Sequence, residues 1–213
     1  MDKFITFEGI EGCGKTTQIK MAGDYLSGTG IPVVLTEEPG GTAFGRKIRD
    51  IVLNRSSYDI SAEAELLLFL SARAQHVREL IKPALIQNKI VLCDRFSDAT
   101  MAYQGFGRGL NTDALEAMNA FAAASLKPLK TFLFDLPPEI GLSRAMRRIS
   151  QLKDFTPKED RFERETVAFH ERVREGYLRI AKDDPDRFVI IDAAPDVHAV
   201  FDQVRSCLLP LVT

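Results

Sequence analysis

Residues 3–17, KFITFEGIEGCGKTT, place a short apolar run directly before a glycine-rich loop. The pattern G-x-x-x-x-G-K-[ST] is satisfied by Gly9, Gly14, Lys15 and Thr16. In this pattern the glycines let backbone N–H groups turn onto phosphate oxygens, the lysine adds a point charge, and the hydroxyl ligates Mg²⁺. The loop requires a strand before it and a helix after it, so the segment predicts a polyphosphate site at the start of an α/β fold.

Five short apolar runs recur along the chain, and each is nearly continuous instead of alternating. They occupy residues 3–7, 32–36, 89–93, 130–136 and 187–192. Helical patterning occupies residues 15–27, 42–54, 61–87, 111–124, 138–149, 160–182 and 196–209. Continuous apolar strands alternating with helices predict a parallel, doubly wound sheet covered on both faces. Ligands bind beyond the carboxyl ends of such strands, so the residues just after each run are the candidates for function.

The bulk composition narrows the class of protein. The 213 residues fit one domain, carry a net charge of −2, and include three scattered cysteines without a CxxC pair. Near-neutral charge argues against a dedicated nucleic-acid or membrane-surface binder, and unpaired cysteines fit a reducing compartment. The longest aliphatic and aromatic run, residues 66–70, is far too short to span a membrane. We therefore expect a single-domain cytoplasmic protein, residues 1–213, without a nucleic-acid or membrane partner.

Two motifs of GTP-dependent switch proteins are missing, which argues against that class of protein. Asn88 and Lys89 are not followed by the aspartate of the guanine motif N-K-x-D, and the chain contains no D-x-x-G. After the third apolar run, Asp94 stands where a carboxylate can organise Mg²⁺ and its waters, and Arg95 adds a planar fork for phosphate. Asp94 is therefore a candidate metal ligand, and Arg95 is a candidate phosphate ligand.

Arginines also follow the second apolar run. Arg46 and Arg49 lie on the helix after TEEPGGT, residues 36–42. Two strand ends then present arginines toward one crevice, although the loop already supplies Lys15 for one polyphosphate. A second phosphoryl group explains this best, which favours a kinase with a phosphorylated acceptor. The alternative is that these arginines make surface ion pairs.

Four motifs in order, GIEGCGKTT, EPGGT, FLSARAQHV and DRFSDATMAYQG, resemble the thymidylate kinase family of the bacterial type, from about residue 3 to residue 192. The resemblance implies the P-loop nucleoside monophosphate kinase fold, with a five-stranded parallel sheet flanked by helices and a mobile lid. It also implies ATP and Mg²⁺ as cosubstrates, dTMP as acceptor, dTDP as product, and a homodimer. Rival readings are another nucleoside monophosphate or deoxynucleoside kinase of this fold, and an ATP-binding regulatory module.

The acceptor pocket is expected in residues 36–76 and 94–108. Phe69 and Arg73 share a helical face, where a ring and a guanidinium can stack on a base and reach its O4 edge. The resemblance assigns thymine to this pair. It further implies that Tyr103 crowds the sugar 2′ position, that Gln104 approaches the base, and that Glu11 approaches the sugar 3′-OH.

The predicted site residues fall into four sets. The nucleotide-binding set is Gly9, Glu11, Gly12, Cys13, Gly14, Lys15, Thr16 and Thr17. The acceptor-binding set is Glu11, Glu38, Pro39, Arg49, Phe69, Arg73, Arg95, Tyr103 and Gln104. The metal ligands are Thr16 and Asp94, and the catalytic set is Lys15, Asp94, Arg95, Arg148 and Arg161.

Some details of the acceptor region follow from the resemblance alone. Glu37 stands where the family usually has arginine, and Ala99 where it often has serine, which affects affinity more than reaction type. The family also implies a cis peptide bond before Pro39.

Phosphoryl transfer needs a cation at the transferring group, and the variable loop residues 10–13 contain no base. Residues 143–165 form the one locally basic, apolar-poor stretch, which we assign as the lid. We expect Arg148 or Arg161 to contact the transferring phosphoryl, with Arg161 preferred because DRFE matches the family's lid pattern. The alternative is a solvated charged helix. The lid looks longer than usual around residues 151–158.

Overall fold

A computed structural model describes residues 3–53, 59–151 and 161–212. Five parallel strands form one sheet in the order β2-β3-β1-β4-β5. The strands are β1 (Phe4–Glu8), β2 (Val33–Glu37), β3 (Ile90–Asp94), β4 (Lys130–Asp135) and β5 (Phe188–Asp192). Each strand starts within one residue of the start of a predicted apolar run. The predicted parallel sheet is therefore confirmed.

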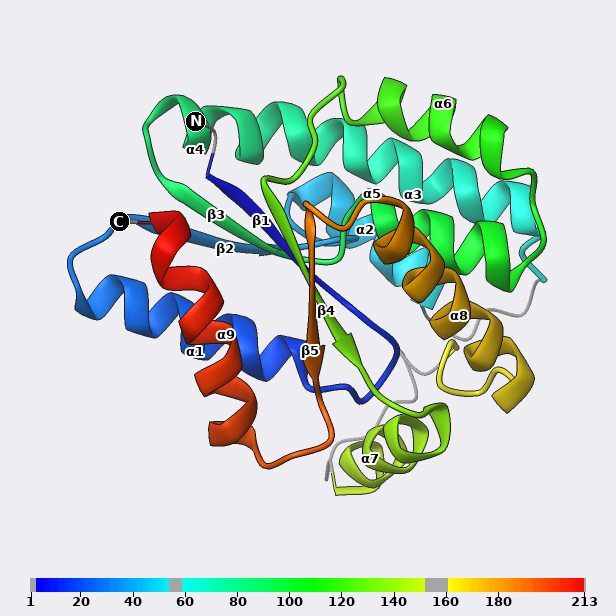
Figure 1. Cartoon of the computed structure of the whole chain (residues 1–213). Coiled ribbons are helices and arrows are strands. Elements are labelled where there is room, and N and C mark those ends of the chain that lie inside the picture. Colours follow the sequence, from blue (N-terminus) through cyan, green and yellow to red (C-terminus); the bar gives the residue numbers. More distant parts are fainter. Residues whose placement is uncertain (1–2, 54–58, 152–160, 213) are drawn as a thin grey trace.

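Helices cover both faces of this sheet. The helical elements are α1 (Lys15–Gly28), α2 (Ala43–Leu53), α3 (Ala62–His76), η1 (Val77–Ile81), α4 (Lys82–Ile86), α5 (Ser97–Thr100), η2 (Met101–Gly107), α6 (Thr112–Ala122), α7 (Pro138–Gln151), α8 (Val167–Asp183) and α9 (Val197–Val212). Helices α1 and α9 lie on one side of the sheet, and α3 to α6 and α8 lie on the other (Figure 1). None of the helices within the described ranges is long and apolar enough to cross a membrane.

Two predicted helices differ from the structure. The helix expected from residue 160 begins at Val167, because the Thr166 side chain caps it by accepting a hydrogen bond from the Phe169 amide. The single helix expected over 61–87 is interrupted by the π-helical turn η1. Pro83 has no N–H to donate to the carbonyl four residues earlier, which explains the wider turn before it. The helical turns α5 and η2 over 97–107 were not predicted.

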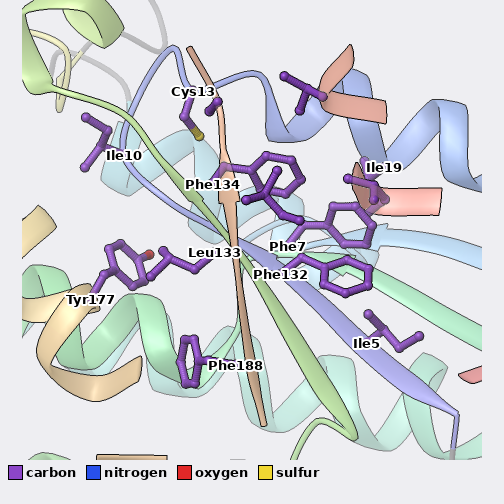
Figure 2. Close-up of a cluster of buried hydrophobic side chains, with 14 of the residues drawn as sticks. Ile5, Phe7, Ile10, Cys13, Ile19, Phe132, Leu133, Phe134, Tyr177 and Phe188 are labelled. Carbon is purple, nitrogen blue, oxygen red and sulfur yellow. The ribbon is translucent and has the colours of Figure 1, made fainter. Parts of the chain in front are cut away.

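Aromatic rings from the central strands fill the core. Phe7 on β1 stacks on Phe134 of β4 at a centroid distance of 5.7 Å, and it meets Phe132 edge to face at 5.4 Å. Figure 2 shows Leu133 pointing from β4 to the opposite side, where Tyr177 lies. Both sides of β4 are therefore apolar, as the continuous run predicted.

The phosphate loop packs against the first turns of α7 through two glycines. A Cβ atom at Gly12 would lie 1.9 Å from the Gly141 carbonyl oxygen, and one at Gly141 would lie 2.5 Å from the Glu11 carbonyl oxygen. Gly12 also has a φ of 70°, which favours glycine. Only a residue without a side chain fits at either place, so the loop and α7 are in backbone contact.

Candidate active site

One pocket of about 540 Å³ lies at the carboxyl ends of β1, β2 and β3. The predicted site residues that line it are Glu11, Gly12, Lys15, Thr16, Glu38, Pro39, Arg49, Phe69, Arg73, Asp94, Arg95, Tyr103, Gln104 and Arg148. The predicted residues outside its lining are Gly9, Cys13, Gly14, Thr17 and Arg161. Sequence segments far apart thus meet at the edge of the sheet where ligands were expected.

The phosphate loop has the backbone that its sequence predicts. Gly9, Gly12 and Gly14 all have positive φ, at 142°, 70° and 90°. Helix α1 begins at Lys15, directly after the loop, so its N-terminal N–H groups face the pocket edge. The Lys15 ammonium donates to the Ile10 carbonyl at 3.2 Å. The loop is therefore shaped to surround an anion.

Thr16 and Asp94 lie together, as expected of metal ligands. The Thr16 hydroxyl donates to Asp94 Oδ2 at 2.6 Å. Hydroxyl and carboxylate oxygens suit Mg²⁺, which keeps several waters and uses one or two protein ligands plus substrate phosphates. The described residues contain no group of three or more His, Cys, Asp or Glu side chains able to hold a metal by themselves. The donor set fits a Mg²⁺ ion that arrives with a polyphosphate.

Arg95 occupies a constrained place just after β3. Its φ of 69° lies in the left-handed region, which is uncommon for a residue with a side chain. Its Nη2 donates to Glu11 Oε1 at 2.7 Å and to the Tyr103 hydroxyl at 2.9 Å. Its Nη1 donates to the Tyr177 hydroxyl at 3.3 Å. The guanidinium is thereby fixed in orientation at the floor of the pocket.

The turn that carries Arg95 is held by Glu8, whose fully buried carboxyl group lies at the end of β1. Glu8 accepts the Phe96 amide N–H and the Tyr177 hydroxyl, both at 2.7 Å. Burial, and then the negative charge of Asp98, raise the pKa of Glu8 to about 8. The sequence did not predict a role for Glu8, because its position directly before the phosphate loop does not distinguish it from the loop residues.

Glu11 faces the same guanidinium from the phosphate loop. Its Oε1 accepts from Arg95 and from the Tyr103 hydroxyl, the latter at 2.6 Å. Burial acts to raise the pKa of Glu11, but Arg95, His170 and Lys15 together lower it well below its usual value. Glu11 is therefore an ionised carboxylate that bridges the phosphate loop and the expected sugar region.

Arg73 is buried and held almost entirely by the protein. Its Nε donates to Glu38, its Nη1 to Thr100 and Asn119, and its Nη2 to the Phe96 carbonyl. A guanidinium has five N–H donors, so one on Nη2 is left for a ligand among the described contacts. Its orientation is thus fixed before any ligand enters.

Glu37 and Arg49 form an ion pair on the acceptor side. Arg49 Nη1 lies 3.0 Å from Glu37 Oε2 and also donates to the Pro39 carbonyl at 2.9 Å. The Glu38–Pro39 peptide bond is cis, as the family resemblance implied. Glu37 therefore pairs with a predicted phosphate ligand, and its effect on affinity stays a prediction.

The two lid arginines are placed differently. Arg148 lines the pocket with its side chain 60% exposed and lies 3.5 Å from Glu163. Arg161 lies instead in a 2.6 Å ion pair with Glu65, a fully buried carboxylate on α3. The longer stretch expected at 151–158 lies largely outside the described residues. The structure thus brings Arg148, and not Arg161, to the pocket.

Phe162 also lines the pocket, which the sequence did not indicate. Its ring lies 5.4 Å from that of Tyr103 and 6.4 Å from that of Phe69. The aromatic wall of the pocket therefore has a third member, supplied by the segment assigned as the lid.

The parallel sheet has the strand order β2-β3-β1-β4-β5, and a phosphate loop follows β1. Arginines from other elements line the same pocket. Together these features define a P-loop nucleotide kinase. A profile of the thymidylate kinase family matches residues 7–204. Similar proteins include the thymidylate kinases of Syntrophus aciditrophicus, 54% identical over 96% of this chain and 93% of the relative, and of Geotalea uraniireducens, 48% identical over 98% and 97%. The chain belongs to the thymidylate kinase family.

A solved structure agrees with this assignment. The crystal structure of thymidylate kinase from Ehrlichia chaffeensis aligns with 98% of this chain across 98% of its own chain, with a TM-score of 0.77 and 34% sequence identity. The fold is accordingly that of P-loop nucleoside monophosphate kinases.

The raised pKa of Glu8 predicts a specific pH dependence of stability. Between the ordinary carboxyl pKa of 4.5 and about 8, the folded protein holds a proton that the unfolded chain has lost. The free energy of unfolding should therefore fall as pH rises through this window, and Glu8→Gln should remove that slope. Urea titrations of both proteins from pH 5 to pH 8 measure it. Glu139→Gln, at an exposed residue of α7, is the control, and equal slopes in wild type and Glu8→Gln would contradict the prediction.

Proposed function

We propose that this chain transfers the γ-phosphoryl group of ATP to dTMP, giving ADP and dTDP. The observation that carries the proposal is a single pocket with a phosphate loop at one end and an aromatic and arginine-lined cavity at the other. A volume of about 540 Å³ is in the range of small-molecule sites. Family membership supports the same reaction.

On the acceptor side, each predicted contact has a suitable group. Phe69 lines the pocket and would offer a ring face to a base, and the remaining N–H of Arg73 would donate to a carbonyl edge such as O4 of thymine. Gln104 Nε2 donates to Glu65 at 2.8 Å, which leaves its carbonyl oxygen for the base. Arg95 provides the planar fork for the acceptor phosphate.

On the donor side, the loop amides and Lys15 would bind the β and γ phosphates of ATP. Thr16 and Asp94 would hold Mg²⁺, which neutralises charge on the phosphates when bound. Lys15 is buried to 8% exposure, so its charge acts in a site largely removed from water. These residues position and stabilise the transferring group, which is most of what phosphoryl transfer requires of a protein.

We assign the additional cation to Arg148. Its weak, exposed pair with Glu163 leaves it able to move to a phosphoryl group, whereas Arg161 is held at 2.6 Å by a buried carboxylate. A charge paired in the interior is costly to separate. Arg161 then acts on the placement of Phe162, over whose ring its guanidinium lies at 5.4 Å.

We also propose that residues 1–213 act as one kinase domain. Residues 36–76 and 94–108 form its acceptor side, and residues 143–165 its lid. The three cysteines are free, which fits a reducing cytoplasm. A net charge of −2 offers no excess of positive charge for nucleic acid or an anionic membrane.

A homodimer is proposed through α3 and α6. Leu67, Met118 and Phe121 are 60%, 42% and 89% exposed, and they line a groove of about 520 Å³ between these helices. This apolar face suits the same face of a second copy, as a twofold interface requires. Because α3 also carries Phe69 and Arg73, the dimer would brace the wall of the acceptor pocket.

The proposed reaction predicts an order of acceptors. The kcat/KM for dTMP should exceed that for dUMP by roughly 10- to 200-fold, since one methyl-sized contact is worth about 1–3 kcal/mol. A coupled assay of ADP release across nucleoside monophosphates measures the order. Equal use of dTMP and dGMP would contradict the proposed function.

Variants of the lid arginines separate the two roles. Arg148→Ala should lower kcat by about 10³-fold with little change in the KM for dTMP, because the contact forms only in the transition state. Arg161→Ala should chiefly raise the KM for dTMP by loosening Phe162. The matched control is Arg147→Ala, at an exposed residue of α7, the helix that carries Arg148. If instead Arg161→Ala abolishes kcat and Arg148→Ala stays within about twofold, a change below 0.5 kcal/mol, the assignment is reversed.

The dimer predicts the behaviour of a surface variant. Phe121→Glu should convert the protein to its 23.8 kDa monomer at micromolar concentration, because it places a charge in the apolar interface. Sedimentation equilibrium measures the mass. Ile86→Glu, at an 80% exposed residue of α4, should leave the dimer intact. A wild-type protein that is already monomeric would refute the homodimer.

A further inference from the structure

His170 lies between the phosphate loop and the lid, and no part of the proposed mechanism uses it. It is on α8 and only 1% exposed. Its Nε2 lies 2.9 Å from the Phe162 carbonyl oxygen, and its Nδ1 lies 3.2 Å from Glu11 Oε2. One imidazole therefore bridges two chain segments that both line the pocket.

The chemistry of these two partners assigns the protons of the ring. A carbonyl oxygen only accepts, so Nε2 must carry a hydrogen. A neutral imidazole with its proton on Nε2 would place Nδ1, then an acceptor, 3.2 Å from a carboxylate oxygen that is also an acceptor. A proton is therefore needed between Nδ1 and Glu11 Oε2.

The state of Glu11 indicates where that proton belongs. Glu11 Oε2 is buried and accepts no hydrogen bond among the described contacts, although His170 Nδ1 lies 3.2 Å away, while Oε1 accepts from Arg95 and Tyr103. Arg95 cannot accept, and its charge favours an ionised carboxylate. A buried carboxylate oxygen without a partner is costly, and a protonated imidazole satisfies it.

We propose that His170 is an imidazolium that positions Glu11 and ties the lid to the phosphate loop. Its Nδ1–H holds Oε2, so that Oε1 stays directed at Arg95 and Tyr103. Its Nε2–H holds the backbone of Phe162, whose ring lines the pocket. His170 is thus a positioning residue for the acceptor pocket, and its effect on catalysis rests on the proposed function.

The surrounding charges are arranged around this pair. Arg95 acts on Glu11 from the turn after β3, Lys15 from the start of α1, and Glu163 from the lid side. On α8 itself, Tyr177 contacts Arg95 through its hydroxyl at 3.3 Å. Without the charge of His170, the second oxygen of Glu11 would have only Arg95 and Lys15 as neighbouring cations among the described residues. The imidazolium therefore engages Oε2, while Oε1 stays paired with Arg95.

The proton assignment can be tested without any assay of activity. The chain has three histidines, so ¹⁵N-histidine labelling with His170→Gln and His198→Gln identifies each ring. In wild type at neutral pH, both nitrogens of His170 should show the chemical shifts of protonated imidazolium nitrogens. His76 is the internal comparison, because its partners Glu38 and Thr36 do not require a charged ring. A shift typical of an unprotonated nitrogen at Nδ1 of His170 would overturn the proposal, whatever the substrate proves to be.

Kinetics test the positioning role. His170→Gln should lower kcat/KM for dTMP by about 10- to 100-fold, mainly through KM, since a hydrogen bond to a charged group is lost. His198→Gln, at an exposed residue of α9, should change it by less than about twofold. In a Glu11→Gln background, His170→Gln should cost less than about threefold, because the charge it serves has gone. An equal loss in both backgrounds, or none in wild type, would refute the positioning role.

Discussion

The hydrogen bond from the Phe96 amide to the buried Glu8 carboxyl group joins the end of β1 to the turn after β3. That turn places Arg95 in the left-handed region, an unfavourable backbone conformation that the surrounding contacts must maintain. From there Arg95 reaches Glu11 and the two tyrosine hydroxyls. The Glu8 carboxyl group thus adds to the pairing of β1 with β3, and to the hydrogen bond from the Arg95 amide to the Phe7 carbonyl, in fixing the turn that supplies the acceptor arginine.

Around this turn, each arginine that lines the pocket is paired with a carboxylate. The pairs are Arg49–Glu37, Arg73–Glu38, Arg95–Glu11 and Arg148–Glu163. Their burial differs, because the Arg73 pair is almost fully enclosed while the side chain of Arg148 is mostly exposed. Enclosed pairs keep a guanidinium in one orientation, whereas exposed pairs exchange partners at little cost. Among the residues that the structure describes, the pocket therefore combines fixed recognition groups with Arg148, a cation whose mostly exposed pair can exchange partners.

The sequence predicted the sheet and most of the pocket, because continuous apolar runs and the glycine pattern are local features. It also predicted that Phe69 and Arg73 belong to the site, since both lie on one helical face. It did not reveal Glu8, Phe162 or His170, whose roles depend on contacts with Phe96, Phe69 and Glu11, each more than 80 residues away in the sequence. The preference for Arg161 rested on motif likeness, and the structure places that residue against Glu65 because a buried carboxylate on α3 demands a partner.

The backbone contact between Gly12 and Gly141 has a mechanical consequence for α7. The helix is fixed against the phosphate loop near its start, and Arg148 lies seven residues further on, about 10 Å along the axis at 1.5 Å per residue. A tilt of about 10° around this contact would carry Arg148 by about 2 Å, while the loop backbone hardly moved. A helix pivoting on a pair of glycines thus gives its far end a range of travel comparable to the difference between a loose and a tight ionic contact.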